Sequence, residues 1–249
     1  MILFLTSSPC DDNVPEGVDL PCILNENNWF VENMREYWIP DTKCLIIAAD
    51  PENYELNDEM AETFFNAFNY HDLTISEMML CDMRNAEDIE DMVSESDMII
   101  LGGGHVPTAN IFYWEMGLPY LLEDYDGIIM GISAGTMNCA EIVYAQPEMP
   151  GESIDPDYER YIPGLGLTDI NVLPHYQEVK DNILDGRRLY EDITYEDSMD
   201  NAFIVLVDGS YVLQKDDEQW VFGESYLLWN GEMEQLCEDG ENLELNTEI

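Results

Sequence analysis

The sequence predicts an α/β fold in which a mostly parallel, doubly wound sheet is covered by helices on both faces. Strands and helices alternate strictly through the first part of the chain. The predicted strands are continuous apolar runs, as expected for strands that are buried on both faces. Towards the C-terminus, apolar runs are joined through Asp-Gly at 208–209 and through Asn-Gly at 230–231, a pattern typical of antiparallel hairpins.

The individual elements follow from hydrophobic spacing and from Gly and Pro positions. Buried strands are predicted at residues 1–5, 43–49, 73–80, 97–101, 127–132 and 170–173. Helices are predicted at 25–38, 57–68, 86–93, 108–122 with an interruption at 117–119, after the turn at 131–135, and around 186–193. The two hairpins pair 203–207 with 210–214 and 226–229 with 232–236.

The chain of 249 residues is long enough for one α/β domain with a well-buried core. It contains neither an internal repeat nor a linker long enough to divide it, so we expect one domain over 1–249. Residues 146–166 are rich in Pro and Gly and are predicted to form a long loop, which in a compact domain is usually functional or mobile. The acidic tail at about 238–249 is expected to fray.

Charge excludes several classes of partner. The chain has 54 Asp and Glu against 8 Lys and Arg, a formal net charge of −46. Nucleic acid and anionic membranes both require clustered positive charge, so neither is expected. The N-terminus has no basic segment typical of a signal peptide, and no apolar run approaches the roughly 18 residues of a membrane span, which predicts a cytoplasmic protein. None of the six cysteines forms a C-x-x-C pair, so we expect no disulfide framework and no metal or other cofactor.

The most informative motif is GISAG at residues 131–135. It follows a buried strand and precedes a helical segment, which is the context of a nucleophile elbow. In such a turn Ser133 is exposed above the sheet, and the N–H groups of the following helix face a developing oxyanion. The alternative is a strand-to-helix turn without chemistry, because a G-x-S-x-G pattern is short.

Ligands of doubly wound sheets bind beyond the carboxyl ends of the strands. Three predicted sites fall at such ends: the glycines and His105 of 102–105, Ser133, and Pro174 with His175. A serine nucleophile needs an imidazole as its base. His71 precedes a strand and is expected on the surface at the opposite edge, and His105 is expected in a loop or at a helix start. His175 is therefore the favoured base.

The third member of a triad is a carboxylate that orients the imidazole. Glu178 and Asp181 are close to His175 in sequence, and Asp208 ends a strand. Asp-Gly is also a common turn by itself. These arguments do not separate the three acids.

Four motifs in this order resemble the peptidase E family of serine peptidases, which includes aspartyl dipeptidases and the related cyanophycinases. They are GGGH at 102–105, GISAG at 131–135, NVLPHY at 171–176 and VLVDGSYV at 205–212. The resemblance extends from residue 1 to about residue 230. It implies a three-layer α/β/α sandwich similar to class I glutamine amidotransferases, and a serine hydrolase.

Carried over to matching positions, the resemblance implies Ser133 as nucleophile, His175 as general base and Asp208 as the acid. The backbone of Gly103, Gly104 and Ala134 would hold the oxyanion. The chain departs from the family in two places. Asp208 stands where the family typically has glutamate, and His105 stands where it usually has asparagine.

The resemblance also implies small peptide substrates, among them dipeptides with an N-terminal aspartate. An acidic side chain requires a cationic contact, for which Arg187 or Arg188 are the candidates, with His105 as a further substrate contact. The alternative for the two arginines is a surface pair that neutralises Asp185 and Glu191. A cyanophycinase-like or other amide hydrolase with the same triad, and a binding protein without turnover, remain the rival functions. A homodimer is one possible assembly.

Overall fold

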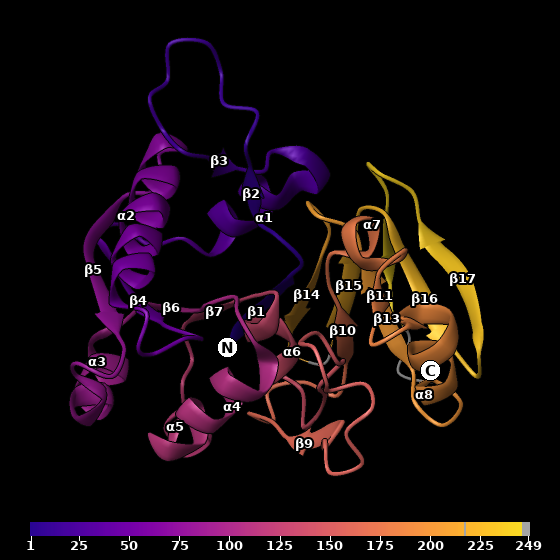
Figure 1. The fold of residues 1–249 in the computed structure, drawn as a ribbon. Coiled ribbons are helices and arrows are strands. Elements are labelled where there is room, and N and C mark those ends of the chain that lie inside the picture. The colour runs from indigo at the N-terminus through magenta and orange to yellow at the C-terminus, as the bar shows by residue number, and fades with distance from the viewer. Residues whose placement is uncertain (217, 246–249) are drawn as a thin grey trace.

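The computed structural model describes residues 1–216 and 218–245, and an eight-stranded sheet runs through its centre (Figure 1). In spatial order its strands are β18 (Asn242–Glu244), β15 (Glu218–Phe222), β14 (Tyr211–Lys215), β1 (Ile2–Thr6), β7 (Ile128–Ile132), β6 (Met98–Leu101), β4 (Thr42–Ile47) and β5 (Ile75–Cys81). The strands β1, β7, β6, β4 and β5 are parallel, whereas β14, β15 and β18 extend the sheet in antiparallel fashion. A mixed α/β fold with a large, mostly parallel sheet was the sequence-based expectation and is confirmed.

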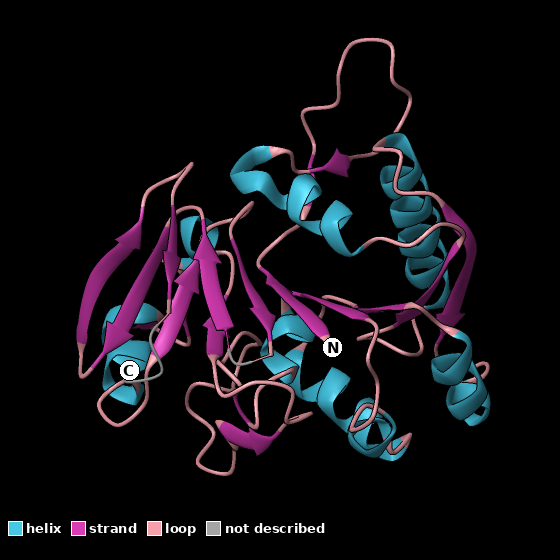
Figure 2. Cartoon of the chain, turned by 180° about the vertical axis from the view of Figure 1, so that it is seen from behind, coloured by secondary structure: helices cyan, strands magenta, loops and turns pink. Residues whose placement is uncertain are grey.

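Helices cover both faces of the parallel strands (Figures 1 and 2). They are α1 (Phe30–Tyr37), which follows η1 (Asn27–Trp29), and α2 (Tyr54–Tyr70) on one face, and α3 (Ile89–Glu95), which follows η2 (Ala86–Asp88), α4 (Val106–Glu115) and α5 (Leu118–Leu121) on the other. The period-2 geometry of a strand explains this arrangement. Ile46 belongs to the apolar cluster beneath α1 and α2, and its neighbour Ile47 to the cluster beneath α3, α4 and α5.

A second sheet of four strands was not predicted. Its order is β10 (Asn171–Leu173), β13 (Phe203–Leu206), β16 (Ser225–Trp229) and β17 (Glu232–Cys237). Its apolar face packs against the short helix α6 (Ala134–Asn138) and the π-helix η3 (Tyr190–Thr194), and α7 (Tyr176–Val179) and α8 (Tyr195–Asp197) lie beside it. Three two-stranded pairs complete the fold: β2 (Cys10–Asp11) with β3 (Ile23–Leu24), β8 (Ile142–Tyr144) with β9 (Tyr161–Pro163), and β11 (Ile183–Leu184) with β12 (Arg187–Arg188).

One predicted hairpin is confirmed and the other is wrong. Asn230 and Gly231 both have positive φ, at 51° and 73°, as a two-residue turn that matches strand twist requires, and β16 pairs with β17. At the other turn only Gly209 has positive φ, and Asp208 does not. Such a turn splays its flanking strands. Accordingly β13 pairs in the second sheet, whereas β14 pairs with β1 and β15 in the first.

Three smaller predictions also need correction. The helix expected around 186–193 begins only with η3, because residues 187 and 188 pair with β11 as strand β12. The helix after the elbow ends at Asn138, whose carbonyl accepts the N–H of Leu165. The tail was expected to fray, but residues 242–244 form β18 against β15, while residues 246–249 lie outside the described part.

Two expectations from composition can be compared with the structure. None of the described helices combines the length and the apolar character that a membrane span requires. The six cysteines, all within the described residues, are free thiols.

The packing of α6 onto β6 predicts that Gly135 cannot carry a side chain. A Cβ built there would lie 2.1 Å from the carbonyl oxygen of Leu101. We expect Gly135→Ala to lower the free energy of unfolding by about 3 kcal/mol or more, because backbone on both sides would have to move. Gly240→Ala is the control. A Cβ at Gly240 meets open space and only its positive φ is unfavourable, so a loss of about 1 kcal/mol is expected. Equal melting temperatures for the two variants would contradict the packing argument.

Candidate active site

Ser133 occupies a strained turn between β7 and α6. Its φ of 51° and ψ of −113° lie outside the regions that residues with a side chain normally adopt. Gly131 permits the turn, because a Cβ there would lie 2.6 Å from the Cα of Thr136. The backbone N–H of Ser133 donates to the carbonyl of Thr6 on the neighbouring strand β1 at 3.2 Å. The geometry is that of a nucleophile elbow, with the serine partly exposed above the sheet.

Backbone N–H groups predicted to hold an oxyanion border this serine. A Cβ built on Gly103 would lie 3.5 Å from the Cβ of Ser133, so the two backbones are adjacent. Gly104 lines the same cavity as Ser133, and Ala134 is the first residue of α6. Within the described part of the chain, the N–H groups of these three residues donate no hydrogen bond. They are therefore available to an anionic oxygen at this position.

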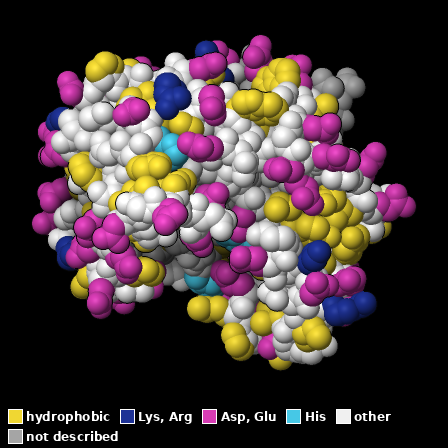
Figure 3. Space-filling view, turned by 90° about the horizontal axis from the view of Figure 1, so that it is seen from above, with side chains coloured by type: hydrophobic (Ala, Val, Ile, Leu, Met, Phe, Trp, Pro, Cys, Tyr) yellow, Lys and Arg dark blue, Asp and Glu magenta, His cyan; other side chains and the backbone are white. Residues whose placement is uncertain are grey.

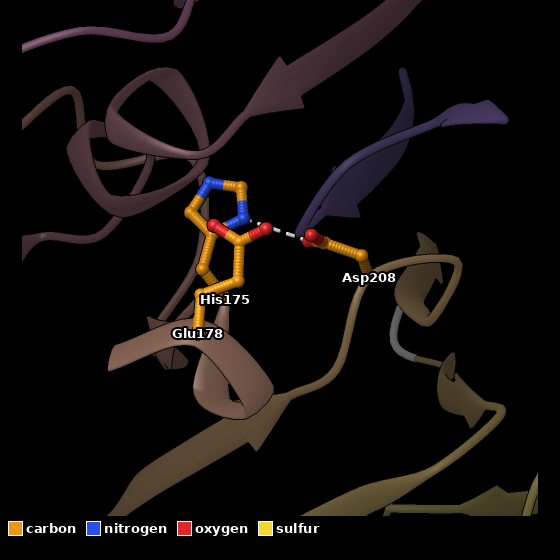
Figure 4. Close-up of side chains that lie close together, drawn as sticks. All are labelled: His175, Glu178 and Asp208. Atoms are coloured by element: carbon orange, nitrogen blue, oxygen red, sulfur yellow. Dashed lines mark hydrogen bonds and ion pairs between the residues drawn. The ribbon is translucent and has the colours of Figure 1, made fainter. Parts of the chain in front are cut away.

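His175 and Asp208 lie at strand ends of the second sheet and meet there (Figure 4). His175 follows β10 at a positive φ of 57°, and Asp208 follows β13. The Nδ1 atom of His175 is 2.7 Å from Oδ1 of Asp208. Of the three acids that the sequence left open, Asp208 is hydrogen-bonded to the imidazole. Glu178 lies beside it, and Asp181 is exposed.

Two further residues of this network were missed in the sequence. The hydroxyl of Ser7 donates to Oδ1 of Asp208 at 2.6 Å and accepts the backbone N–H of His175 at 2.8 Å. The amide nitrogen of Gln177 donates to Oδ2 of Asp208 at 2.6 Å, and its amide oxygen accepts the N–H of Asp208. Ser7 follows the first strand directly, so the strand-end rule could have identified it. No sequence signal marks Gln177.

The electrostatics of His175 favour its cationic form. Burial disfavours the imidazolium and by itself lowers the pKa of His175. The hydrogen bond and the charge of Asp208, together with the charges of Glu178 and Glu148, outweigh burial and raise the pKa. For Asp208, burial opposes the anion, but the hydrogen bonds from His175 and Ser7 prevail and lower its pKa. The pair is therefore an anionic carboxylate holding an imidazole that readily accepts a proton.

Ser133 and His175 line one cavity of about 220 Å³. Its wall also includes residues 146–148 from the long loop and 182–184 from the segment after α7. Neither Oγ of Ser133 nor Nε2 of His175 has a hydrogen-bond partner among residues 1–216 and 218–245. Hydrogen bonds of this kind often tighten only when substrate is bound. The arrangement leaves both groups open to a molecule in the cavity.

His105 lies beside the cavity and not in its lining. Its Nδ1 is 2.8 Å from Oγ1 of Thr108, and its Nε2 is 2.8 Å from Oε1 of Glu152. Both ring nitrogens are thus engaged. Because Glu152 belongs to the long loop, His105 ties this loop to the start of α4. Its contacts support an anchoring role and give no support to direct substrate binding.

Arg187 and Arg188 are also absent from the lining. The Arg187 guanidinium donates to the carbonyl oxygens of Ser153 and Asp192 and lies 3.7 Å from Glu196. Arg188 binds the carboxylate of Asp192 through two nitrogens. The acidic partners therefore differ from Asp185 and Glu191, which the alternative reading of this pair named. Nothing in these contacts supports the predicted contact with a substrate carboxylate.

His71 was expected on the surface but is 6% exposed. It ends α2, and its Nδ1 lies 3.4 Å from Glu26, a residue of the segment before α1. Tyr70 covers its ring edge-on. Burial lowers its pKa, and no cavity connects it with Ser133. The prediction that His71 lies apart from the site agrees with this position.

Within the described residues, one group could hold a metal ion: His175, Glu178 and Asp208, whose ligand atoms lie within 4.8 Å of one another (Figure 4). The short contact between Nδ1 and Oδ1 is a hydrogen bond, which leaves no room for an ion between these two atoms. The donor geometry therefore fits a histidine–carboxylate pair better than a metal site.

Comparisons with known proteins bear on the family and the fold of the chain. The model of peptidase family S51 matches residues 47–221. A peptidase from an acI-B1 Actinobacterium has a similar structure, with a TM-score of 0.64 at 18% identity, covering 98% of this chain and 96% of that one. The "Putative Peptidase E Protein" from Listeria monocytogenes EGD-e has a TM-score of 0.58 at 17% identity, covering 95% and 98%. At these identities the likeness concerns the fold. No curated protein matches the chain. Because the family match extends over more than half of its residues, the chain belongs to peptidase family S51.

Proposed function

We propose that this peptidase is a serine hydrolase that cleaves small peptides through Ser133, His175 and Asp208. The observation that carries the proposal is a strained serine at a strand-to-helix turn. It lines one cavity with a histidine whose Nδ1 is hydrogen-bonded to the half-buried carboxylate of Asp208. A nucleophile, a base and an orienting acid are the parts that covalent acyl transfer requires.

In the proposed reaction, Oγ of Ser133 attacks the scissile carbonyl while Nε2 of His175 accepts the hydroxyl proton. The N–H groups of Gly103, Gly104 and Ala134 stabilise the negative charge on the former carbonyl oxygen. His175 then donates its proton to the leaving amine, which gives an acyl-serine and the first product. Water, deprotonated by His175, hydrolyses the acyl-serine and restores the hydroxyl. Asp208 keeps Nδ1 protonated throughout, so that Nε2 faces the serine.

A preference for N-terminal aspartate, which the family resemblance suggests, has no cation in the cavity to support it. The cavity volume of about 220 Å³ suits a substrate portion of one or two residues. The proposal is therefore a peptidase for short peptides, without a preference for an N-terminal aspartate.

A fluorophosphonate probe tests the nucleophile without knowledge of the substrate. We expect the probe to phosphonylate Ser133 with loss of fluoride, which mass spectrometry of the intact protein detects. Ser133→Ala should abolish labelling and peptide hydrolysis and should keep the circular dichroism spectrum and melting temperature of the wild type. Ser94→Ala, an exposed serine on α3, is the matched control and should be labelled normally. Labelling of Ser133→Ala at the wild-type rate would rule out the mechanism. No labelling of the wild type would favour a binding protein.

The raised pKa of His175 predicts a pH profile. A base must be neutral to accept a proton, so the acid limb of kcat/KM should have an apparent pKa above the ordinary value of about 6.5 for histidine. Asp208→Asn removes the interaction that raises this pKa and leaves burial, so the limb should shift to lower pH. Its plateau should also fall by about two to four orders of magnitude, because the imidazole loses its orientation.

Asp181→Asn is the control for Asp208→Asn, since it removes an exposed acid close to His175 in sequence. Its pH profile should match that of the wild type. The role of Asp208 would be refuted by an acid limb that stays in place and a plateau that stays high in Asp208→Asn.

A further inference from the structure

Two ionisable residues, Glu148 and His175, line the cavity that contains Ser133. The residues that line it include one carboxylate, Glu148, and no lysine or arginine. The only other ionisable group in the lining is His175 itself. On the face seen in Figure 3, histidine side chains lie next to acidic ones. A substrate in this cavity therefore meets a negative wall beside the reacting groups.

Glu148 has no cationic partner of its own. Its Oε1 accepts the backbone N–H of Val106 at 3.3 Å, and its Oε2 accepts no hydrogen bond from the described residues. The nearest imidazole nitrogen is Nε2 of His105 at 4.0 Å, but that atom is already bonded to Glu152 at 2.8 Å. About half of the Glu148 side chain, 47%, is accessible, so a ligand can reach it.

The surroundings of Glu148 disfavour its charge when the cavity is empty. Burial is the main cause that raises its pKa, and the charge of Glu152 adds to it. His105, His175 and the N–H of Val106 oppose this rise but do not cancel it. A positive group in the cavity would stabilise the charged form of Glu148 and lower its pKa.

The basic residues of the chain cannot supply that group. All eight lie within the described residues, and each contacts a partner outside the cavity lining. Five are paired with carboxylates, namely Lys43, Arg84, Arg160, Arg187 and Arg188. Arg35 donates to a backbone carbonyl. Lys180 and Lys215 lie over tyrosine rings. No lysine or arginine of the chain therefore pairs with Glu148, which leaves its free oxygen to a cation of the substrate.

We propose that Glu148 binds a positively charged nitrogen of the substrate, so that the peptidase selects small peptides carrying an ammonium or guanidinium group close to the scissile bond. This inference rests on the proposed function, because it assigns the selectivity of the same cavity. A carboxylate accepts charge-assisted hydrogen bonds from such a group. The net charge of −46 attracts cationic substrates and repels acidic ones before they reach the cavity. The group has two sources, an N-terminal α-ammonium or the side chain of lysine or arginine.

Four p-nitroanilides separate these sources: lysine and norleucine p-nitroanilide, each with a free and an acetylated α-amine. Norleucine keeps the aliphatic chain of lysine and lacks its charge. We expect kcat/KM to fall about three- to tenfold, mainly through KM, when the recognised cation is removed. A fall on acetylation identifies the α-ammonium, and a fall from lysine to norleucine identifies the side chain. In Glu148→Gln, the same change of substrate should have little effect.

Two controls isolate the role of Glu148. Glu123→Gln removes one exposed negative charge before β7, outside the cavity lining, and should keep the full preference for the cation. Fluorophosphonate labelling of Ser133 should persist in Glu148→Gln, since this uncharged probe needs no carboxylate in order to bind. Equal cation preference in Glu148→Gln and the wild type, or no preference in the wild type, would overturn the inference while the labelling result still upholds the nucleophile.

Binding gives a readout that does not require turnover. Calorimetry with Ser133→Ala should show lysinamide binding more tightly than acetylnorleucinamide, which carries no charge. Adding Glu148→Gln to that variant should weaken lysinamide binding about threefold or more and leave acetylnorleucinamide unchanged. Identical lysinamide affinities with and without Glu148 would refute the proposal, even if the wild type failed to react with the probe.

Discussion

The hydrogen bonds that converge on Asp208 join the two sheets at the site. Asp208 lies where the chain leaves β13 of the second sheet for β14 of the first. It accepts bonds from Ser7, which follows β1 in the first sheet, and from His175, which follows β10 in the second. The splayed turn at Asp208 and Gly209 is therefore what brings a carboxylate to the imidazole. A true hairpin there would have kept both flanking strands in one sheet.

The serine is fixed by a separate set of contacts. Thr6 donates from its hydroxyl to the carbonyl of Gly131, and Thr136 donates to the carbonyl of Thr6, so β1 braces the turn on both sides of Ser133. A backbone conformation of this kind costs about 1–3 kcal/mol, which the buried core around it must offset. Ser133 thus follows a strand of the first sheet and His175 a strand of the second, and both line the cavity.

Local signals in the sequence were sufficient to predict the parallel strands and to place Ser133 and His175 directly after strands. Continuous apolar runs mark strands with two covered faces, and Ser133 and His175 each follow such a run. The second sheet was not foreseeable, because the Asp-Gly at 208–209 looks the same whether or not both φ angles are positive. The choice among the three acids depended on that same turn. The burial of His71 depended on contacts with a segment far away in sequence. Arg187 was placed near the site from its distance along the chain, which does not predict the direction of a side chain.

One of the many negative charges of the chain, that of Glu148, lies in the cavity of Ser133. A surplus of carboxylates on an exposed surface is largely screened by solvent and salt. Glu148 differs, because it lines the cavity of Ser133 and its charge raises the pKa of His175. A substrate cation bound to Glu148 would offset this effect and lower the pKa of His175. The base would then be more often unprotonated when a cationic substrate is present than when the cavity is empty. In the proposed mechanism, selectivity and reactivity are thus coupled through Glu148.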